Sequence, residues 1–432
     1  MFKVLNSSKY NISFYLLSII SSIGILAFFL NFNKIVVNIF EVYDFYNLEP
    51  NPYYQFSCGL LTFIIITIIF LLFTKNKIFI YGWILKACVT LFVVLLLEYL
   101  YPGLDQFSYY VASSYYPDKY ASHPFSSGIP AIIQFNSYVA ILFGKSLYSM
   151  KIVSSFFAFL GLILFYKTYE LLTYKQEIKN NLSQYYLFII PSILIWTSLL
   201  GKDSLILFPI GLFVYAYFSF LTKKNLLWFL IILVSLLLAF LVRPWIPLIL
   251  VFTVLLHNFK LNKFYLFLTP IALILMYIIS IKLFQQLNIE SFNELFARLG
   301  QLQQSFSRGG SKVELALIED IWDYTRYFIP NAFITLFYPL PFLGTTNIFL
   351  WFFSFENLVI FGLIIIYVLP KLIKLIKNYN TRFFLILIFG WLLLYVILSP
   401  GNLGTAIRYK VQIIPVIIVL ILLSKNYIMI RK

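Results

Sequence analysis

Long apolar segments separated by short, lysine-rich turns constrain this chain more than any other feature. A lipid core offers no water to backbone N–H and C=O groups, so unbroken apolar runs predict helices rather than open sheets. About twelve runs, with ten to fourteen as the range, approach the length needed to cross roughly 30 Å of hydrocarbon. They lie near residues 12–32, 58–74, 78–100, 147–170, 185–199, 204–221, 226–242, 245–257, 264–284, 347–370, 383–399 and 411–424. The sequence therefore predicts an all-α, polytopic membrane bundle that forms a single domain over residues 1–432.

Composition and charge placement agree with this interpretation. With 62% hydrophobic and only 11% charged residues, the chain has more apolar surface than a soluble protein can bury. Most Lys and Arg residues lie in alternate turns, which hold only two of the 16 acidic residues, Glu170 and Glu177. Basic turns stay on the cytoplasmic side during membrane insertion. This pattern predicts the cytoplasmic membrane with both termini inside, and it explains the net charge of +16 without nucleic-acid binding.

Two proline-containing apolar stretches, 128–145 and 327–345, would reverse this orientation if they crossed the membrane. We expect interfacial or re-entrant helices on the outer face instead. The alternative is two further spans with a weaker charge pattern. With the first interpretation, the outer loops comprise residues 34–57, 101–146, 285–346 and 400–410.

Asp105, in "YPGLDQFSYY", is the first candidate for chemistry. Fourteen of the 16 carboxylates are predicted outside or near the outer boundary, which argues against a cytoplasmic enzyme that needs metal-binding carboxylates for nucleotide-sugars. A carboxylate beside aromatic side chains can act as general base toward a hydroxyl. The alternative role is an N-cap for the segment that follows. His123 has no second His, Cys or carboxylate at ligand spacing, so neither a metal nor another cofactor is expected.

Basic residues at three outer turns form the second candidate. Lys202 and Asp203 lie in "WTSLLGKDSLILF", Arg243 lies in "LVRPWIP", and Arg408 and Lys410 lie in "GNLGTAIRYKVQIIP". Arg binds phosphate in a bidentate manner and Lys acts as a point charge, so the turns can converge on one phosphate group. In this hypothesis Asp203 orients Lys202. The alternatives are a water-exposed turn at Lys202 and basic side chains that simply reach the membrane surface.

The segments "LDQFSYY" and "GIPAIIQFNSYVAILFGKSLYSMKIVSSFFAFLGLILFYKTYELL" resemble the GT-C superfamily of integral-membrane glycosyltransferases. Asp105 matches the acidic residue that follows an early helix in that superfamily, whereas Gln106 stands where a second acid usually occurs. "PSILIWTSLLGKDSLILFPIGLFVYAYF", "RPW" and "GTAIRYKVQIIP" are similar to proteins of bacterial surface-polysaccharide gene clusters, including O-antigen and capsule polymerases. The resemblance extends from about residue 100 onward.

This resemblance implies a sugar donor on polyprenyl phosphate or diphosphate, a glycan acceptor, and work at the outer face alongside other polysaccharide-assembly proteins. Asp105 would deprotonate the acceptor, while Lys202, Arg243 and Arg408 would stabilise the departing phosphate. The rival function is a transporter or flippase for the same lipid-linked sugars. Such a protein needs polar sites near the bilayer midplane, where this sequence has few charges, Lys86 being the clearest.

Overall fold

The computed structural model describes residues 52–100, 105–121, 127–173, 185–258, 318–343 and 348–429, with isolated positions between 294 and 313. Nearly all of these residues are helical, which confirms the all-α prediction. Five described helices are long and apolar enough to cross a membrane, or six if one bent pair counts as a single span. They suggest a membrane protein. The runs 12–32 and 264–284 lie outside the described residues, and the count of about twelve spans stays a prediction.

The helices follow the predicted apolar runs closely. The first half contains α2 (Pro52–Phe73), α3 (Lys77–Cys88), the π-helical turn η1 (Val89–Val93), α4 (Val94–Leu100), α5 (Asp105–Tyr115), α6 (Pro117–Ala121), α7 (Ile129–Phe143), α8 (Leu147–Thr173), α9 (Tyr186–Ile189) and α10 (Pro191–Trp196). The second half contains α11 (Lys202–Lys223), α12 (Leu226–Val242), α13 (Ile246–His257), α16 (Ile321–Phe337), α17 (Ile348–Leu363), η4 (Ile364–Val368), η5 (Leu369–Lys371), α18 (Leu372–Lys377), α19 (Tyr379–Leu398), α20 (Leu403–Lys410) and α21 (Ile414–Met429).

The predicted outer loops are largely helical where the structure describes them. Residues 52–57 belong to α2, region 101–146 contains α5, α6 and α7, and α16 begins at Ile321 rather than near 327. Polar residues start two of these helices. The side chains of Asp320 and Asn402 accept hydrogen bonds from the backbone N–H groups of Asp323 and Thr405. Such caps satisfy the first N–H groups of a helix, so short polar segments fold as helices here.

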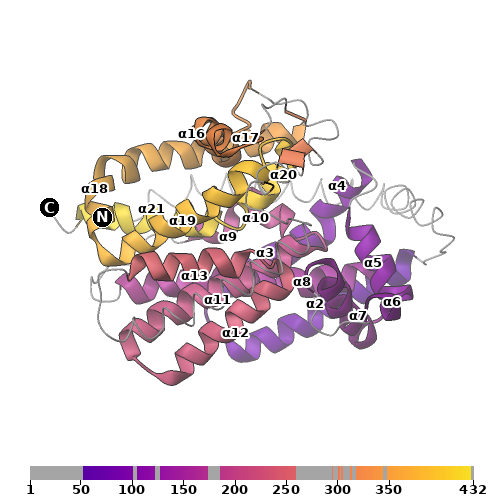
Figure 1. Ribbon diagram of the computed structural model, residues 1–432. Helices are drawn as coiled ribbons and strands as arrows, with labels where there is room; N and C mark the ends of the chain where they lie inside the picture. Colours follow the sequence, from indigo (N-terminus) through magenta and orange to yellow (C-terminus); the bar gives the residue numbers. More distant parts are fainter. Residues whose placement is uncertain are drawn as a thin grey trace, which may run out of the picture.

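A close pair of helices, α8 and α11, forms the centre of the bundle (Figure 1). A Cβ atom at Gly161 would lie 2.5 Å from the Leu207 carbonyl oxygen, and one at Gly211 would lie 2.6 Å from the Gly161 carbonyl oxygen. Only glycine permits this backbone approach. The helices α16, α17 and α18 form a layer beside α19 to α21, and α5, α6 and α7 lie together at one end of the bundle (Figure 1).

Three helices of this bundle, α11, α13 and α19, are joined at one end by a hydrogen-bond network. His257 Nδ1 lies 2.6 Å from the Tyr217 hydroxyl, and His257 Nε2 lies 2.8 Å from the Tyr379 carbonyl oxygen. Because a carbonyl only accepts, Nε2 carries the proton and Nδ1 accepts from Tyr217. Asn258 Nδ2 donates to Tyr217 at 2.9 Å and the Tyr379 hydroxyl donates to Asn258 Oδ1 at 2.9 Å. We call these four residues the His257 network.

Candidate functional site

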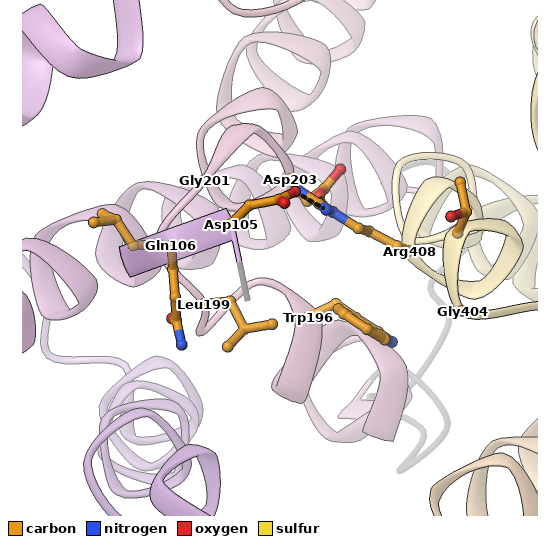
Figure 2. A pocket seen from close by; sticks show the side chains of 10 residues that line it. Asp105, Gln106, Trp196, Leu199, Gly201, Asp203, Gly404 and Arg408 are labelled. Atoms are coloured by element: carbon orange, nitrogen blue, oxygen red, sulfur yellow. Dashed lines mark hydrogen bonds and ion pairs between the residues drawn. The ribbon is translucent and has the colours of Figure 1, made fainter. Parts of the chain in front are cut away.

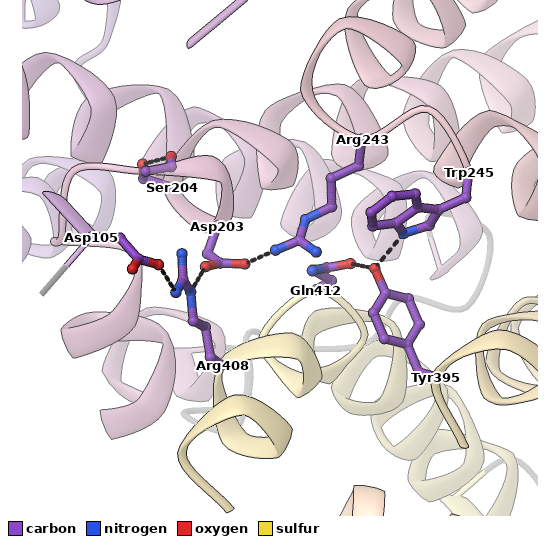
Figure 3. Close-up of polar contacts among 9 residues, drawn as sticks. Asp105, Asp203, Ser204, Arg243, Trp245, Tyr395, Arg408 and Gln412 are labelled. Atoms are coloured by element: carbon purple, nitrogen blue, oxygen red, sulfur yellow. Dashed lines mark hydrogen bonds and ion pairs between the residues drawn. The ribbon is translucent and has the colours of Figure 1, made fainter. Parts of the chain in front are cut away.

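Asp203 is the centre of a charged cluster at the other end of α11. Arg243 Nη2 donates to Asp203 Oδ1 at 2.5 Å, and Arg408 Nε donates to Asp203 Oδ2. Arg408 Nη1 also donates to Asp105 Oδ2 at 2.9 Å. Figure 3 shows the resulting chain of alternating charges, Asp105–Arg408–Asp203–Arg243. The structure therefore unites four of the predicted site residues, from positions 303 residues apart in the chain.

Local sequence explains how each member reaches the cluster. Asp203 lies in the first turn of α11, where the helix dipole favours a negative charge. Pro244 disfavours a helical conformation for the residue before it, so α12 ends at Val242 and Arg243 takes an extended conformation. The Asn402 cap starts α20, which carries Arg408. Three turns that are far apart in the sequence thus meet at Asp203.

Burial distinguishes the members of this cluster. The side chains of Asp203 and Arg243 are 4% and 2% exposed, whereas those of Arg408 and Asp105 are 27% and 66% exposed. Moving an ion out of water costs several kcal/mol even after relaxation, and only close partners offset this. Asp203 is therefore no water-exposed turn residue. Asp105 and Arg408 are the charged groups open to a ligand.

Arg243 is enclosed by aromatic side chains as well as by Asp203. Its guanidinium carbon lies 4.6 Å from the centroid of the Tyr409 ring and 5.9 Å from that of Trp245. Trp245 Nε1 donates to the Tyr395 hydroxyl at 2.9 Å, and that hydroxyl donates to Gln412 Oε1 at 2.9 Å (Figure 3). A cation stacked in this way is held in one geometry. Arg243 thus positions Asp203 rather than facing open space.

A pocket of about 280 Å³ opens beside the cluster (Figure 2). It is lined by Asp105, Gln106, Trp196, Leu199, Leu200, Gly201, Asp203, Gly404, Thr405 and Arg408. Figure 2 shows Asp105 and Asp203 meeting at Arg408, with Leu199 and Trp196 on the opposite wall. The pocket therefore combines a free carboxylate edge, a guanidinium and an apolar wall.

Lys202 lies on another side of α11, near α7. A Cβ atom on Gly128 would lie 3.6 Å from Lys202 Nζ, and the ammonium is within electrostatic range of both aspartates and both arginines of the cluster. Within the described residues, Lys202 and Asp203 form no ion pair. The two arginines occupy both Asp203 oxygens, and the expected orienting role of Asp203 toward Lys202 stays a prediction.

A second pocket, of about 320 Å³ and mainly apolar, begins one helical turn beyond Lys202. It lies between α7, α8, α11 and α12, and the Gly128 N–H donates to the Leu241 carbonyl at 2.8 Å at its edge. Its walls are Ala131, Ile132, Gln134, Phe135, Tyr138, Phe157, Leu205, Phe208, Pro209, Leu238, Leu241 and Val242.

Lys410 does not join the cluster. Its side chain is buried and donates a hydrogen bond to Asn357 Oδ1 on α17, near the partly buried carboxylate of Glu356. Residues two apart on an α-helix point about 200° from one another, so Arg408 and Lys410 of α20 cannot share one partner group. The structure does not bring Lys410 into the cluster, since its described hydrogen-bond partner belongs to α17, and its predicted phosphate contact stays a prediction.

Sequence reasoning missed a buried ion pair behind Asp105. Lys151 pairs with Glu98, both side chains being fully buried, and Gln106 Nε2 donates to Glu98 Oε1 at 2.5 Å. This pair anchors the first turn of α5 to α4 and α8. The sequence did contain a signal for this pair, because Glu98 and Lys151 are charged residues within two apolar runs. Trp196 and Thr405 were also missed, although both lie in segments that had attracted attention for their charges.

No family model, curated protein or solved structure matches this chain. Its chemistry must therefore be judged from the site itself. A carboxylate beside a guanidinium can accept a proton from a hydroxyl while the guanidinium binds an anion. No group of three or more potential metal ligands occurs among the described residues.

Proposed function

We propose that this protein is an integral-membrane glycosyltransferase of the GT-C type. It transfers or polymerises sugars from polyprenyl-phosphate or polyprenyl-diphosphate donors onto a glycan acceptor in the assembly of an O-antigen or capsule. The observation that carries the proposal is the exposed carboxylate of Asp105, which shares Arg408 with buried Asp203 at the mouth of a pocket. The proposed workplace is the outer face of the cytoplasmic membrane, where other assembly proteins supply the substrates.

Asp105 is the proposed general base. It accepts the proton of an acceptor hydroxyl while that oxygen attacks the anomeric carbon of the donor. The bond from this carbon to the phosphate oxygen breaks, and the phosphate leaves with the electron pair. Arg408 stabilises the charge that develops on the leaving group, an effect worth about 3 kcal/mol for a well-placed donor.

The shared guanidinium couples these two roles. Arg408 Nη1 is hydrogen-bonded to Asp105, which holds the carboxylate in a charge-assisted contact. A phosphate group competes for the same N–H donors, because arginine binds phosphate in a bidentate manner. Donor binding thus frees the carboxylate for the acceptor hydroxyl. Asp203 keeps Arg408 in place throughout, through its separate bond to Nε.

The apolar pocket beside Lys202 supports an amphipathic donor. A lipid chain matches its mainly apolar walls, and the Lys202 ammonium lies near the end from which a phosphate would project toward Arg408. Lysine serves such a group as a point charge. The two pockets then divide the work: the apolar one holds the carrier, and the charged one holds the reacting sugar.

A transporter for lipid-linked sugars is the alternative proposal. It draws on the buried charges of Lys86, Lys151 and Glu98, since ionisable groups in apolar helices commonly mark a function. None of these three lines either of the two pockets, and each is bonded to fixed partners. The enzyme proposal therefore fits the described residues better.

Reconstituted vesicles separate the two proposals. We expect purified protein with a fluorescent lipid-linked oligosaccharide to give lengthened products, and Asp105→Asn to stop lengthening while donor binding persists. Transbilayer movement of the lipid with no new product would instead support the transporter.

Reporter fusions at Lys224 and Lys374 should both lie inside, and a fusion at Asn402 outside, because basic turns are retained in the cytoplasm.

A further inference from the structure

Lys86, on α3, is a buried cation of an uncommon kind. Its side chain is fully buried, and in the described part of the chain no carboxylate lies within ion-pair distance of it. The ammonium instead contacts four neutral oxygen atoms. They are the carbonyl oxygens of Ile193 and Leu194, at 3.3 and 2.9 Å, and the hydroxyl oxygens of Thr197 and Ser198, at 2.5 and 2.9 Å.

The hydroxyl hydrogens point away from this ammonium. Thr197 Oγ1 donates to the Ile193 carbonyl at 2.5 Å, and Ser198 Oγ donates to the Leu194 carbonyl at 2.6 Å. Each hydroxyl oxygen therefore accepts from the cation, and the Ser198 oxygen also accepts from Thr90 Oγ1 at 2.9 Å. The carbonyls belong to the end of α10, where a positive charge is favoured, and the Ile193 carbonyl also accepts from the Thr197 N–H at 3.2 Å. Together the four oxygens form a neutral cage that suits a monovalent cation.

The cage and the wall of the charged pocket belong to one continuous stretch of chain. The segment 196–201 follows the two caged carbonyls and contributes Trp196, Leu199, Leu200 and Gly201 to the pocket wall. Lys202 and Asp203 come next in the chain. Lys86 itself does not line the pocket, so any influence it has on a ligand passes through this segment.

We propose that Lys86 is a positioning residue, whose ammonium is a tethered monovalent cation that fixes segment 196–201 and thereby the wall of the charged pocket. The consequence for the pocket's reaction rests on the proposed function, but the structural effect does not. A side chain that merely fills space would be replaced well by Met. A tethered cation is replaced instead by a free one, so Lys86→Ala should be rescued by small ammonium ions that enter the vacated cage.

The wall can be monitored with a single cysteine. In a full-length chain with Cys58→Ala and Cys88→Ala, Leu199→Cys places a thiol on the pocket wall, where its maleimide-labelling rate reports local opening. We expect Lys86→Met and Lys86→Ala to label about fivefold faster or more, the change that roughly 1 kcal/mol of lost local stability produces. Methylammonium chloride should return Lys86→Ala to within about twofold of the parent, because its N–H groups meet the same four oxygens.

Two controls make the rescue specific. Tetramethylammonium chloride at equal ionic strength has charge but no N–H donor, and it should have no effect. Adding Thr197→Val and Ser198→Ala to Lys86→Ala removes two cage oxygens and should abolish rescue by methylammonium. Parental labelling in Lys86→Met, or equal effects of the two ammonium salts, would overturn the proposal. If Lys86→Ala does not survive purification, Lys86→Gln carries the test, and it too should label faster than the parent.

Sugar transfer is measured separately in chains that keep Leu199. We expect the loss and the methylammonium rescue of transfer in Lys86→Ala to parallel the labelling. Rescue of labelling with no transfer in any variant, including the native chain, would leave the positioning role intact and refute the glycosyltransferase. If the native chain transfers sugar but the Lys86 variants label at the parental rate, the positioning role is refuted and the glycosyltransferase proposal is kept.

Discussion

The two ends of α11 are joined to neighbouring segments by different chemistry. At the end where α11 begins, Asp203 binds Arg243 and Arg408 by ion pairs. Toward the other end, Tyr217 binds His257 and Asn258 through hydrogen bonds within the His257 network. Charged links are an expensive way to join helices, because apolar replacements of buried ion pairs are often neutral or stabilising. The difference fits the proposed function, in which one end of α11 contributes to stability and the other binds a charged ligand.

Asp203→Asn should have the largest effect, because it removes the charge that both arginines share. An uncompensated buried Arg243 is expected to cost about 3–5 kcal/mol of stability. Sugar transfer should be lost as well, since Arg408 loses its anchor. Thermal unfolding in detergent and product ladders measure the two effects. Asp118→Asn, an exposed carboxylate on α6, is the matched control. Native-like stability of Asp203→Asn would remove the basis for calling Asp203 the centre of the cluster.

Asp105→Asn should come next, with a loss confined to the reaction. Its side chain is 66% exposed, so stability should change little, whereas removal of a general base slows transfer by about 10²–10⁴-fold. Initial rates with a fluorescent lipid-linked donor, at matched protein level, provide the measurement. A rate within twofold of the native chain would show that Asp105 takes no part in the reaction and serves only to start helix α5.

Lys202→Ala should have a moderate effect on the donor. We expect an apparent KM for the donor about tenfold higher, as for loss of a charge-assisted hydrogen bond of roughly 1.5 kcal/mol, with kcat largely kept. Lys202→Arg should retain part of the affinity, because charge survives while geometry changes. Titration of donor at fixed acceptor separates the two constants. An unchanged KM in Lys202→Ala would place the carrier phosphate elsewhere.

Tyr217→Phe should affect transfer least and so complete the comparison. It removes the hydroxyl that donates to His257 and accepts from Asn258. Leaving buried polar groups unsatisfied costs about 1–3 kcal/mol, which thermal unfolding should detect. Transfer rates below the unfolding temperature should match the native chain. A clear loss of transfer in the folded variant would show that the two ends are coupled, contrary to the division of roles argued above.

The helices and the outline of the cluster were predictable from sequence. Apolar runs gave the helix positions because lipid and buried surfaces impose the same requirement on every residue of a run. Asp105, Asp203, Arg243 and Arg408 were singled out individually and lie in one chain of ion pairs. Their residue types and their places at helix ends contained that information.

Partner choice was not predictable. Sequence proximity suggested that Asp203 serves Lys202, but adjacent residues on a helix diverge by about 100° and tertiary packing gave the carboxylate to two distant arginines. Lys410 likewise lies on a different side of α20 from Arg408, and it contacts Asn357 rather than the cluster. The four-oxygen cage of Lys86 depends on backbone carbonyls, which every residue possesses, so no sequence pattern marks it.

The glycine contact between α8 and α11 has a mechanical consequence. Because Gly161 and Gly211 bring the two backbones together without side chains between them, we expect this helix pair to move as one rigid unit. Asp203 lies in the first turn of α11, at one end of this unit. In the proposed glycosyltransferase, entry of a bulky donor would therefore require other helices to move. We expect that movement at the 57° bend between α20 and the start of α21, which would displace Arg408 while α8 and α11 stay in place.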